Sequence, residues 1–203
     1  MLKIGIDFDN TIVQYDQIFH KVALEKGLIS PDVLQKKDEV RNYLRKIDKE
    51  DEWTLLQGYV YGARMTEASP YPGVLDFISN SIKQGNSVFI ISHKTRHPYM
   101  GEKYDLHASA RAWLNKFGFF DSSIIGMPEE NAFFELTKDE KINRIKQQGC
   151  DIFIDDLPEI LQDPAFPDKT KRILFSAREI ELPQGILQIR NWDDLSPEVI
   201  SGS

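Results

Sequence analysis

The sequence has little cysteine and no long hydrophobic run. Cys150 is the single cysteine among 203 residues, which excludes an intramolecular disulfide framework and favours a reducing compartment. No apolar stretch approaches the ~20 residues that a transmembrane helix needs. No hydrophobic signal-peptide core follows the first methionine. We therefore expect a cytoplasmic protein with no membrane partner.

Positive charge is also scarce. The 25 lysine and arginine residues are outnumbered by 32 aspartate and glutamate residues, which gives a formal net charge of −7. No basic patch extends beyond a few residues, so a nucleic-acid polymer is not expected as a partner. The length suits one domain with an insertion, or two small domains, in a monomer or a homodimer.

An acidic motif follows directly after the first hydrophobic run. Residues 2–15 read LKIGIDFDNTIVQY, in which an apolar strand pattern ends at Asp7 and Asp9. In open α/β sheets, ligands bind at the carboxyl ends of the strands, where both acids would lie. Neighbouring carboxylates repel each other unless a cation stands between them, and Mg²⁺ held by carboxylates and a substrate phosphate is the usual solution. The alternative at this point is a solvated turn after an edge strand.

Hydrophobic periodicity divides the remaining chain into alternating helices and strands. Residues 15–68 show three helical stripes, the second beginning at Ser30-Pro31 as an N-cap followed by proline. The prolines of residues 69–72 would return the chain to a core formed by residues 1–14 and 69–203. Further strands are expected at 87–92, 123–126, 151–156, 172–175 and 186–189, and further helices at 74–85, 105–117, 138–149 and 192–199. This alternation predicts an α/β fold with a doubly wound parallel sheet.

Three of the predicted strands end in reactive side chains. Asp7 and Asp9 follow the first strand, Ser92 ends the strand at 87–92, and Asp155 and Asp156 end a later strand. Adjacent parallel strands lie ~5 Å apart, so these groups should form one pocket at the edge of the sheet. Several carboxylates at one edge repel each other unless a cation lies between them. The sequence therefore predicts a magnesium-assisted site at this edge.

The segment DFDNT resembles the first motif of the haloacid dehalogenase superfamily in its phosphatase form. The resemblance implies a Rossmann-like core with an α-helical cap, residues 15–68, inserted after the first strand. It also implies that Asp7 is the nucleophile, which forms an aspartyl-phosphate, and that Asp9 is the general acid and base. Thr11 and Asn10, in the same motif, are expected to bind substrate.

The later motifs of the superfamily occur in the same order along the chain. The resemblance assigns Ser92 to the phosphoryl oxygens and, from IFIDDLPEI, Asp156 to the metal, with Asp155 as a ligand or bound through water. Asp7, through its carboxylate, and Asp9, through its backbone carbonyl, are implied as further metal ligands.

The lysine of the third motif is ambiguous. We prefer Lys138 to Lys141, because a long side chain at a helix start can reach over the strand ends. The alternative for either lysine is a solvated helix face. His93 would touch substrate or remain an exposed loop residue. Residues of the third helix of the cap, Trp53 among them, are expected to face the metal. The alternative for aromatic side chains at helical spacing is a place in the core of the cap.

These features predict a Mg²⁺-dependent phosphatase that hydrolyses a small phosphorylated metabolite. One alternative is a 5'-nucleotidase, because EKYDLHASARAWLNKFGF and ILFSA…NWDDL are similar to segments of the small 5'-deoxyribonucleotidases. Those enzymes often carry glycine where this chain has Asn10. A non-catalytic regulator that binds phosphate or a nucleotide is another alternative, although such a protein needs no proton donor like Asp9. Phosphoryl transfer to an acceptor other than water, as in mutases, stays open.

Overall fold

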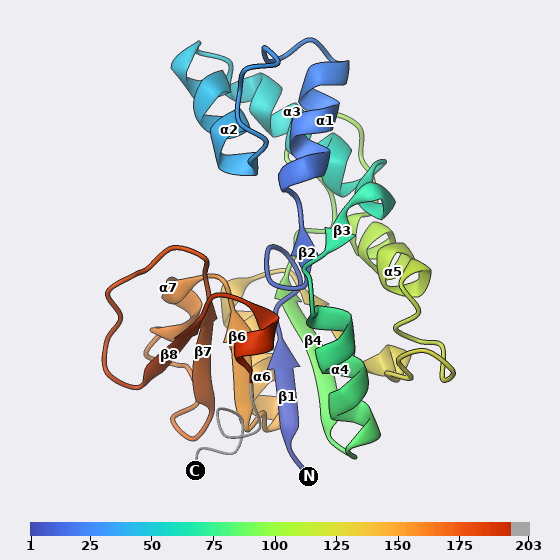
Figure 1. Ribbon diagram of the computed structural model, residues 1–203, viewed down its shortest axis with the longest axis vertical. Coiled ribbons are helices and arrows are strands. Elements are labelled where there is room, and N and C mark those ends of the chain that lie inside the picture. The colour runs from blue at the N-terminus through green and yellow to red at the C-terminus, as the bar shows by residue number, and fades with distance from the viewer. Residues whose placement is uncertain (196–203) are drawn as a thin grey trace. The chain divides into compact units, whose positions relative to one another are not determined.

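The computed structural model describes residues 1–195 and divides the chain into two compact units (Figure 1). The first unit contains Met1–Val13, Pro70–Lys94 and the chain from Gly118 onward, and the second contains Gln14–Ser69 and Thr95–Phe117. The chain therefore passes from one unit to the other four times. The short strands β2 (Val13–Gln14) and β3 (Ser69–Pro70) pair with each other at two of these passages.

A six-stranded sheet forms the centre of the first unit. Its strands are β1 (Lys3–Ile6), β4 (Ser87–His93), β5 (Ala132–Glu135), β6 (Ile152–Asp155), β7 (Lys171–Phe175) and β8 (Ile186–Ile189). They are arranged in the order β5-β4-β1-β6-β7-β8, and every neighbouring pair is parallel. The order runs outward from β1 in both directions, as in doubly wound sheets. This confirms the predicted fold class.

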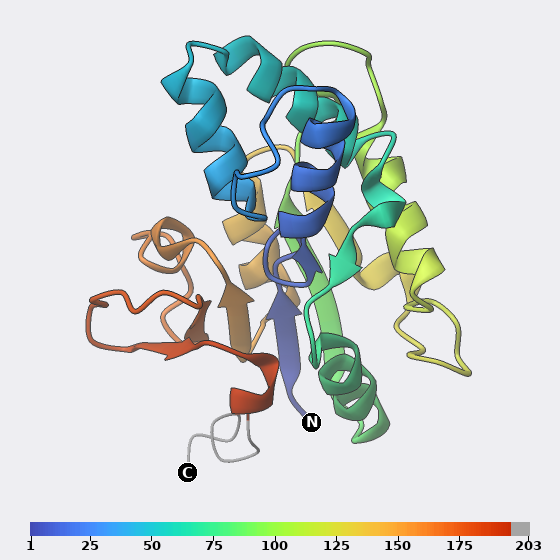
Figure 2. The ribbon, with the colours of Figure 1, turned by 45° about the horizontal axis from the view of Figure 1, so that its top comes forward.

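Helices cover both faces of this sheet. Figures 1 and 2 show α4 (Val74–Lys83) on one face and α6 (Lys138–Gln148) on the other. The short helix α7 (Pro158–Leu161) and the 3₁₀ turns η2 (Glu129–Asn131) and η3 (Trp192–Asp194) complete the unit. A continuous apolar cluster joins alternate strand residues to α6 and α7: Phe89, Ile91, Ile145, Cys150, Phe153, Ile160, Leu161, Phe166 and Leu174. Burial of strand residues on both faces explains their near-continuous apolar runs.

The elements that lie wholly within the second unit are all helices. It consists of α1 (Asp16–Glu25), α2 (Lys37–Lys46), α3 (Glu50–Tyr61), η1 (Met65–Glu67) and α5 (Leu106–Lys116). Aromatic side chains form much of its core, and the ring of Trp53 lies 5.1 Å from that of Phe19. Trp53 is only 2% exposed, so the expectation that this side chain faces a bound metal is wrong. The helical stripe that it occupies is a packing face.

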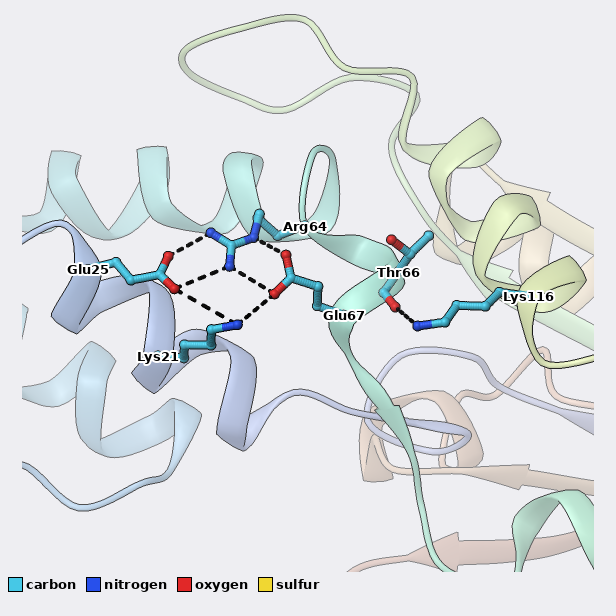
Figure 3. Close-up of polar contacts among 6 residues, drawn as sticks. All are labelled: Lys21, Glu25, Arg64, Thr66, Glu67 and Lys116. Carbon is cyan, nitrogen blue, oxygen red and sulfur yellow. Dashed lines mark hydrogen bonds and ion pairs between the residues drawn. The ribbon is translucent and has the colours of Figure 1, made fainter.

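A polar network ties the end of the helical segment to the start of α1 (Figure 3). Arg64 binds both Glu25, at 2.7 Å, and Glu67, while Lys21 lies 2.9 Å from Glu67. Lys116 of α5 donates a hydrogen bond of 2.6 Å to the backbone carbonyl of Thr66. The residues just before β3 are therefore held to both α1 and α5 within the second unit.

Two boundaries differ from the prediction because local contacts override the sequence pattern. The second helix begins at Lys37, not at Ser30-Pro31, because the Asp16 carboxylate accepts the Lys37 N–H at 2.9 Å and caps it. The strand expected at 123–126 is a turn, in which the Asp121 side chain accepts the Ser123 N–H at 2.8 Å. The strand in this region is β5, which begins at Ala132, six residues after the end of the expected segment.

The closing segment and the cap boundary also differ in detail. The helix expected at 192–199 is the single 3₁₀ turn η3 as far as residue 195, and its remainder lies outside the described residues. Residues 95–117, which we assigned to the core, pack with the helical second unit. Within residues 1–195, no helix is both long and apolar enough to cross a membrane.

Candidate active site

The carboxyl ends of β1, β4 and β6 bring the predicted reactive groups together. β1 lies between β4 and β6, and the Asp7 N–H donates to the Ile154 carbonyl at 2.9 Å. Asp7 and Ser92 are almost fully buried, and Asp155 is completely buried. Ligand atoms of Asp7, Asp155 and Asp156 all lie within 4.8 Å of one another. The convergence expected from the strand pattern is therefore present.

Lys141 neutralises much of this buried charge. Its Nζ atom lies 2.6 Å from Asp7 Oδ1 and 2.6 Å from Asp155 Oδ2, and the side chain is 1% exposed. Burial alone would lower the pKa of the Lys141 ammonium, but the two carboxylates raise it well above its usual value. Burial raises the pKa of Asp155 to about 6, although the Lys141 charge opposes that rise.

The preferred lysine of the sequence analysis lies elsewhere. Lys138 is exposed and pairs with Glu159 at 3.4 Å, so the structure places Lys141 rather than Lys138 in the acidic cluster. Helical side chains tilt toward the N-terminus of their helix, and Lys138 is the first residue of α6. Lys141, three residues later on the same helix, reaches the strand ends with its Nζ atom.

Thr11 connects the first and last acidic segments. Its hydroxyl lies 3.4 Å from both Asp7 Oδ2 and Asp156 Oδ1, and the residue is fully buried. The preceding residue, Asn10, has φ +58°, a left-handed conformation that asparagine tolerates better than most residues. The loop therefore curls back on itself, and the Ile12 and Val13 N–H groups both donate to the Phe8 carbonyl.

Sequence reasoning missed a second lysine. Lys94 follows β4, is 5% exposed, and its Nζ atom lies 2.6 Å from Asp9 Oδ2. The Asp9 carboxylate is therefore paired with Lys94 and is not part of the three-carboxylate cluster. The sequence could have indicated this residue, because Lys94 stands two positions after Ser92 and therefore lies just past the end of the same strand.

The side chains of Ser92 and His93 differ in whether they have a hydrogen-bond partner within the protein. In the described part of the chain, the buried Ser92 hydroxyl has no hydrogen-bond partner, so it is available to a bound group. The His93 Nε2–H donates a hydrogen bond of 3.1 Å to the Leu136 carbonyl, so this ring is held by the backbone. Because successive strand residues face opposite sides, His93 points away from the side that Ser92 occupies.

The donor set suits a hard divalent cation. Four carboxylates (Asp7, Asp9, Asp155 and Asp156) face two lysines (Lys94 and Lys141), which leaves two negative charges in a largely buried site. All candidate ligand atoms of the cluster are carboxylate oxygens, which are the ligands that Mg²⁺ prefers. Zn²⁺ sites usually include sulfur or nitrogen ligands as well. The residues therefore fit a magnesium ion in both charge and donor chemistry.

Comparison with known proteins supports the fold. No model of a known protein family matches the sequence. A provisionally named nucleotidase of Bacillus cereus is 26% identical over 170 residues, 79% of each chain. A haloacid dehalogenase-like family hydrolase from Xanthomonas campestris is 8% identical with a TM-score of 0.58, over 100% of this chain and 95% of that one. D,D-heptose 1,7-bisphosphate phosphatase from B. bronchiseptica, complexed with magnesium and phosphate, is 12% identical with a TM-score of 0.54 over the whole of both chains. The chain thus has the fold of the haloacid dehalogenase superfamily hydrolases.

Proposed function

We propose that this chain is a haloacid dehalogenase superfamily hydrolase that removes the phosphate group from a small phosphomonoester with the help of Mg²⁺. The observation that carries the proposal is the buried Lys141, which joins the first acidic strand end at Asp7 to the last at Asp155. A buried, acid-rich cluster costs stability, and a protein that used this sheet only as a scaffold would have no reason to retain it.

Asp7 acts as the nucleophile in this proposal. One of its carboxylate oxygens is bound by Lys141 and the other by the Thr11 hydroxyl, so the side chain is held in a single orientation. Attack of an Asp7 oxygen on phosphorus breaks the ester P–O bond and leaves an aspartyl-phosphate. The Ser92 hydroxyl is placed to donate to a phosphoryl oxygen, and the Lys141 ammonium offsets the charge of Asp7 and Asp155 beside it.

Asp9 acts as the general acid and base in this proposal. Asp9 must carry a proton when substrate is bound. In the first half-reaction it gives this proton to the leaving alkoxide oxygen, and in the second it takes a proton from the water that attacks the aspartyl-phosphate, which returns it to the protonated form. The second step releases inorganic phosphate and restores the Asp7 carboxylate. Lys94 holds the Asp9 side chain by a 2.6 Å contact and thereby positions it.

Mg²⁺ would be held by Asp7, Asp155 and Asp156, and by the backbone carbonyl of Asp9 in the arrangement that the family resemblance implies. When bound, the ion supplies charge stabilisation for the phosphoryl oxygens. Asp155 has a second contribution, because its carboxylate accepts the Leu157 N–H at 3.0 Å and so fixes the backbone beside Asp156.

The helical second unit acts as a cap in this proposal. It is inserted directly after the first motif, within residues 15–68, and residues 95–117 join it. A cap excludes water from the phosphoryl group and limits the size of the substrate. The Rossmann-like core then comprises residues 1–14 and 69–203, apart from the segment that packs with the cap.

Hydrolysis of nucleoside 5'-monophosphates is the second candidate function. It is favoured by the 26% identity to the Bacillus cereus protein, which extends over 79% of this chain. A non-catalytic regulator is disfavoured, because the chain retains Asp9 together with a lysine that orients it.

A substrate panel tests both functions. Sugar phosphates, nucleoside 5'-monophosphates and an aryl phosphate are incubated with the protein, with Mg²⁺ or with excess chelator, and released phosphate is measured. We expect Mg²⁺-dependent turnover of at least one group. Preference for nucleotides over sugar phosphates would establish the nucleotidase function. Equal turnover of every compound in chelator would contradict the metal-assisted mechanism.

A further inference from the structure

Two late segments of the sequence, ILFSA at 173–177 and NWDDL at 191–195, meet in one aromatic cluster. Phe175 of β7 and Trp192 of η3 belong to these segments, and their ring centroids lie 5.5 Å apart. Phe77 of α4 lies 5.2 Å from the same indole, and Trp192 is only 2% exposed. The indole is therefore enclosed by other elements of the first unit, close to the loop that follows β1 (Figure 1).

The turn η3 holds this indole in a defined position. Asn191 and Asp194 form a reciprocal capping box across the turn, and the Asp194 carboxylate also accepts the Arg190 N–H at 2.9 Å. Gly73 packs directly against the turn, because a Cβ atom at this position would lie 3.2 Å from the Trp192 Cβ atom. The φ of +83° at Gly73 also favours glycine. The turn therefore has little room to shift relative to the start of α4.

The indole N–H reaches the loop between Asp7 and β2. Trp192 Nε1–H donates a hydrogen bond of 3.2 Å to the Thr11 carbonyl. The next carbonyl, that of Ile12, accepts the Tyr71 N–H at 2.9 Å. Thr11 is fully buried, so water cannot easily replace the indole donor. Because this donor is a side chain and the Tyr71 donor belongs to the backbone, a substitution of Trp192 removes the first bond and leaves the second.

Thr11 connects this bond to two carboxylates of the acidic cluster. Its hydroxyl lies 3.4 Å from Asp7 Oδ2 and 3.4 Å from Asp156 Oδ1. Hydroxyl hydrogen bonds are usually ~2.5–3.0 Å long, so both contacts lie at the outer limit of the interaction. A small displacement of the Thr11 backbone would therefore strengthen or break them.

We propose that Trp192 is a positioning residue, which holds the Thr11 backbone so that the Thr11 hydroxyl orients Asp7 and Asp156. It acts through Thr11, and not by contact with a substrate, on the proposed nucleophile and on one residue that would hold Mg²⁺. Hydrogen-bond partners of metal ligands typically contribute about 10- to 100-fold to metal affinity or activity. The effect on the rate rests on the proposed function, whereas the effect on the loop does not.

Two substitutions separate the hydrogen bond from the packing of the ring. Trp192→Phe keeps a six-membered ring in the aromatic cluster but has no donor. Trp192→His fills less space, but its Nε2 atom occupies the same position in the five-membered ring as the indole Nε1 and can donate to Thr11. At pH 8 this imidazole is neutral, because the ordinary pKa of histidine is about 6.5. A role through the donor predicts that Trp192→His resembles the wild type more than Trp192→Phe does, and a role in packing alone predicts the reverse order.

Hydrogen exchange of the full-length protein at pH 8 tests the position of the loop. The Ile12 and Val13 amides donate to the Phe8 carbonyl at 3.1 and 3.0 Å, and they should exchange about five- to tenfold faster in Trp192→Phe than in the wild type. Trp192→His should increase the exchange rates less. The control Phe77→Leu loosens the packing around the indole but keeps the donor, so it should also increase them less than Trp192→Phe. Unchanged exchange in Trp192→Phe, or faster exchange in Trp192→His, would overturn the proposal.

Catalysis and metal binding test the consequence for the acidic cluster. In Trp192→Phe, the rate of phosphate release and the Mg²⁺ affinity measured by calorimetry should each fall about 10- to 100-fold, and Trp192→His should recover part of both losses. A wild-type rate and a wild-type Mg²⁺ affinity in Trp192→Phe would overturn the role in catalysis. The exchange experiment needs neither substrate nor metal, so a failure of the proposed function is distinguishable from a failure of the positioning role.

Discussion

The replacement Lys141→Met tests the arrangement of the buried charges. It removes the ammonium that lies 2.6 Å from both Asp7 and Asp155, and it raises the surplus at the site from two negative charges to three. Removing one partner of a buried ion pair typically costs about 3–5 kcal/mol, because the remaining charge is left buried without compensation. The matched control Lys138→Met removes an exposed lysine from the same helix and should change the free energy of unfolding by less than about 1 kcal/mol.

Urea unfolding at several pH values measures how much stability Lys141→Met loses and whether charge causes the loss. The folded-state pKa of Asp155 is raised to about 6 by burial, so between about pH 4 and 6 the folded state binds more protons than the unfolded state. The ionised Asp155 therefore destabilises the fold above pH 6, and this penalty is relieved as the pH falls through 6. The Lys141 charge opposes the rise of the Asp155 pKa, so this pKa should rise further in Lys141→Met, and more of the variant's Asp155 should be protonated at pH 5. Part of the loss of stability in Lys141→Met should therefore disappear at pH 5, and added Mg²⁺ should restore stability at pH 7.

Equal stability of Lys141→Met and Lys138→Met at pH 7 would refute this reasoning. It would mean that the buried lysine does not compensate Asp7 and Asp155. A loss that is the same at pH 5 and pH 7 would show that a packing defect, rather than charge, is responsible.

Three further predictions concern other parts of the same unit. Lys94→Met should lower the rate of phosphate release by up to about 10²-fold, because a misplaced Asp9 loses part of its acid–base contribution. The control Lys103→Met should leave this rate unchanged, and equal rates in the two variants would refute the positioning role of Lys94. In urea unfolding, Asn10→Val should have a free energy of unfolding about 1–2 kcal/mol lower than that of Asn10→Gly, because the left-handed backbone at φ +58° disfavours β-branched residues. A more stable Asn10→Val would contradict this reasoning. Burial raises the pKa of the Cys150 thiol to about 12, so a thiol reagent at pH 8 should label it only after unfolding, and rapid labelling of the folded protein would disprove its burial.

The strand ends could be predicted from the sequence because their pattern is local and their convergence is geometric. The runs that end at Asp7, Ser92 and Asp155 are apolar on both faces, which only a sheet covered on both sides requires. Parallel pairing then brings these strand ends to one edge of the sheet, independently of the conformation of the connecting loops. The capping box at Thr137 and the stop at Gly149 fixed the limits of α6 in the same local way.

The lysines could not be predicted with the same certainty. Lys138 and Lys141 are separated by less than one helical turn, and the choice depends on where the axis of α6 meets the sheet. Lys94 lies in a segment without periodicity, so only the folded structure shows that it reaches Asp9. The strand β5 was missed because its four residues are followed by a polar run, which masks a short strand.

The most direct test of the central claim is a rapid acid quench of the protein with a radiolabelled phosphomonoester that it hydrolyses. With Mg²⁺ present, the wild type should carry an acid-stable, hydroxylamine-sensitive label, as an aspartyl-phosphate would. Asp7→Asn should carry none and should not turn over substrate, while its circular dichroism spectrum matches that of the wild type. Label or turnover at wild-type levels in Asp7→Asn would contradict the assignment of Asp7 as the nucleophile.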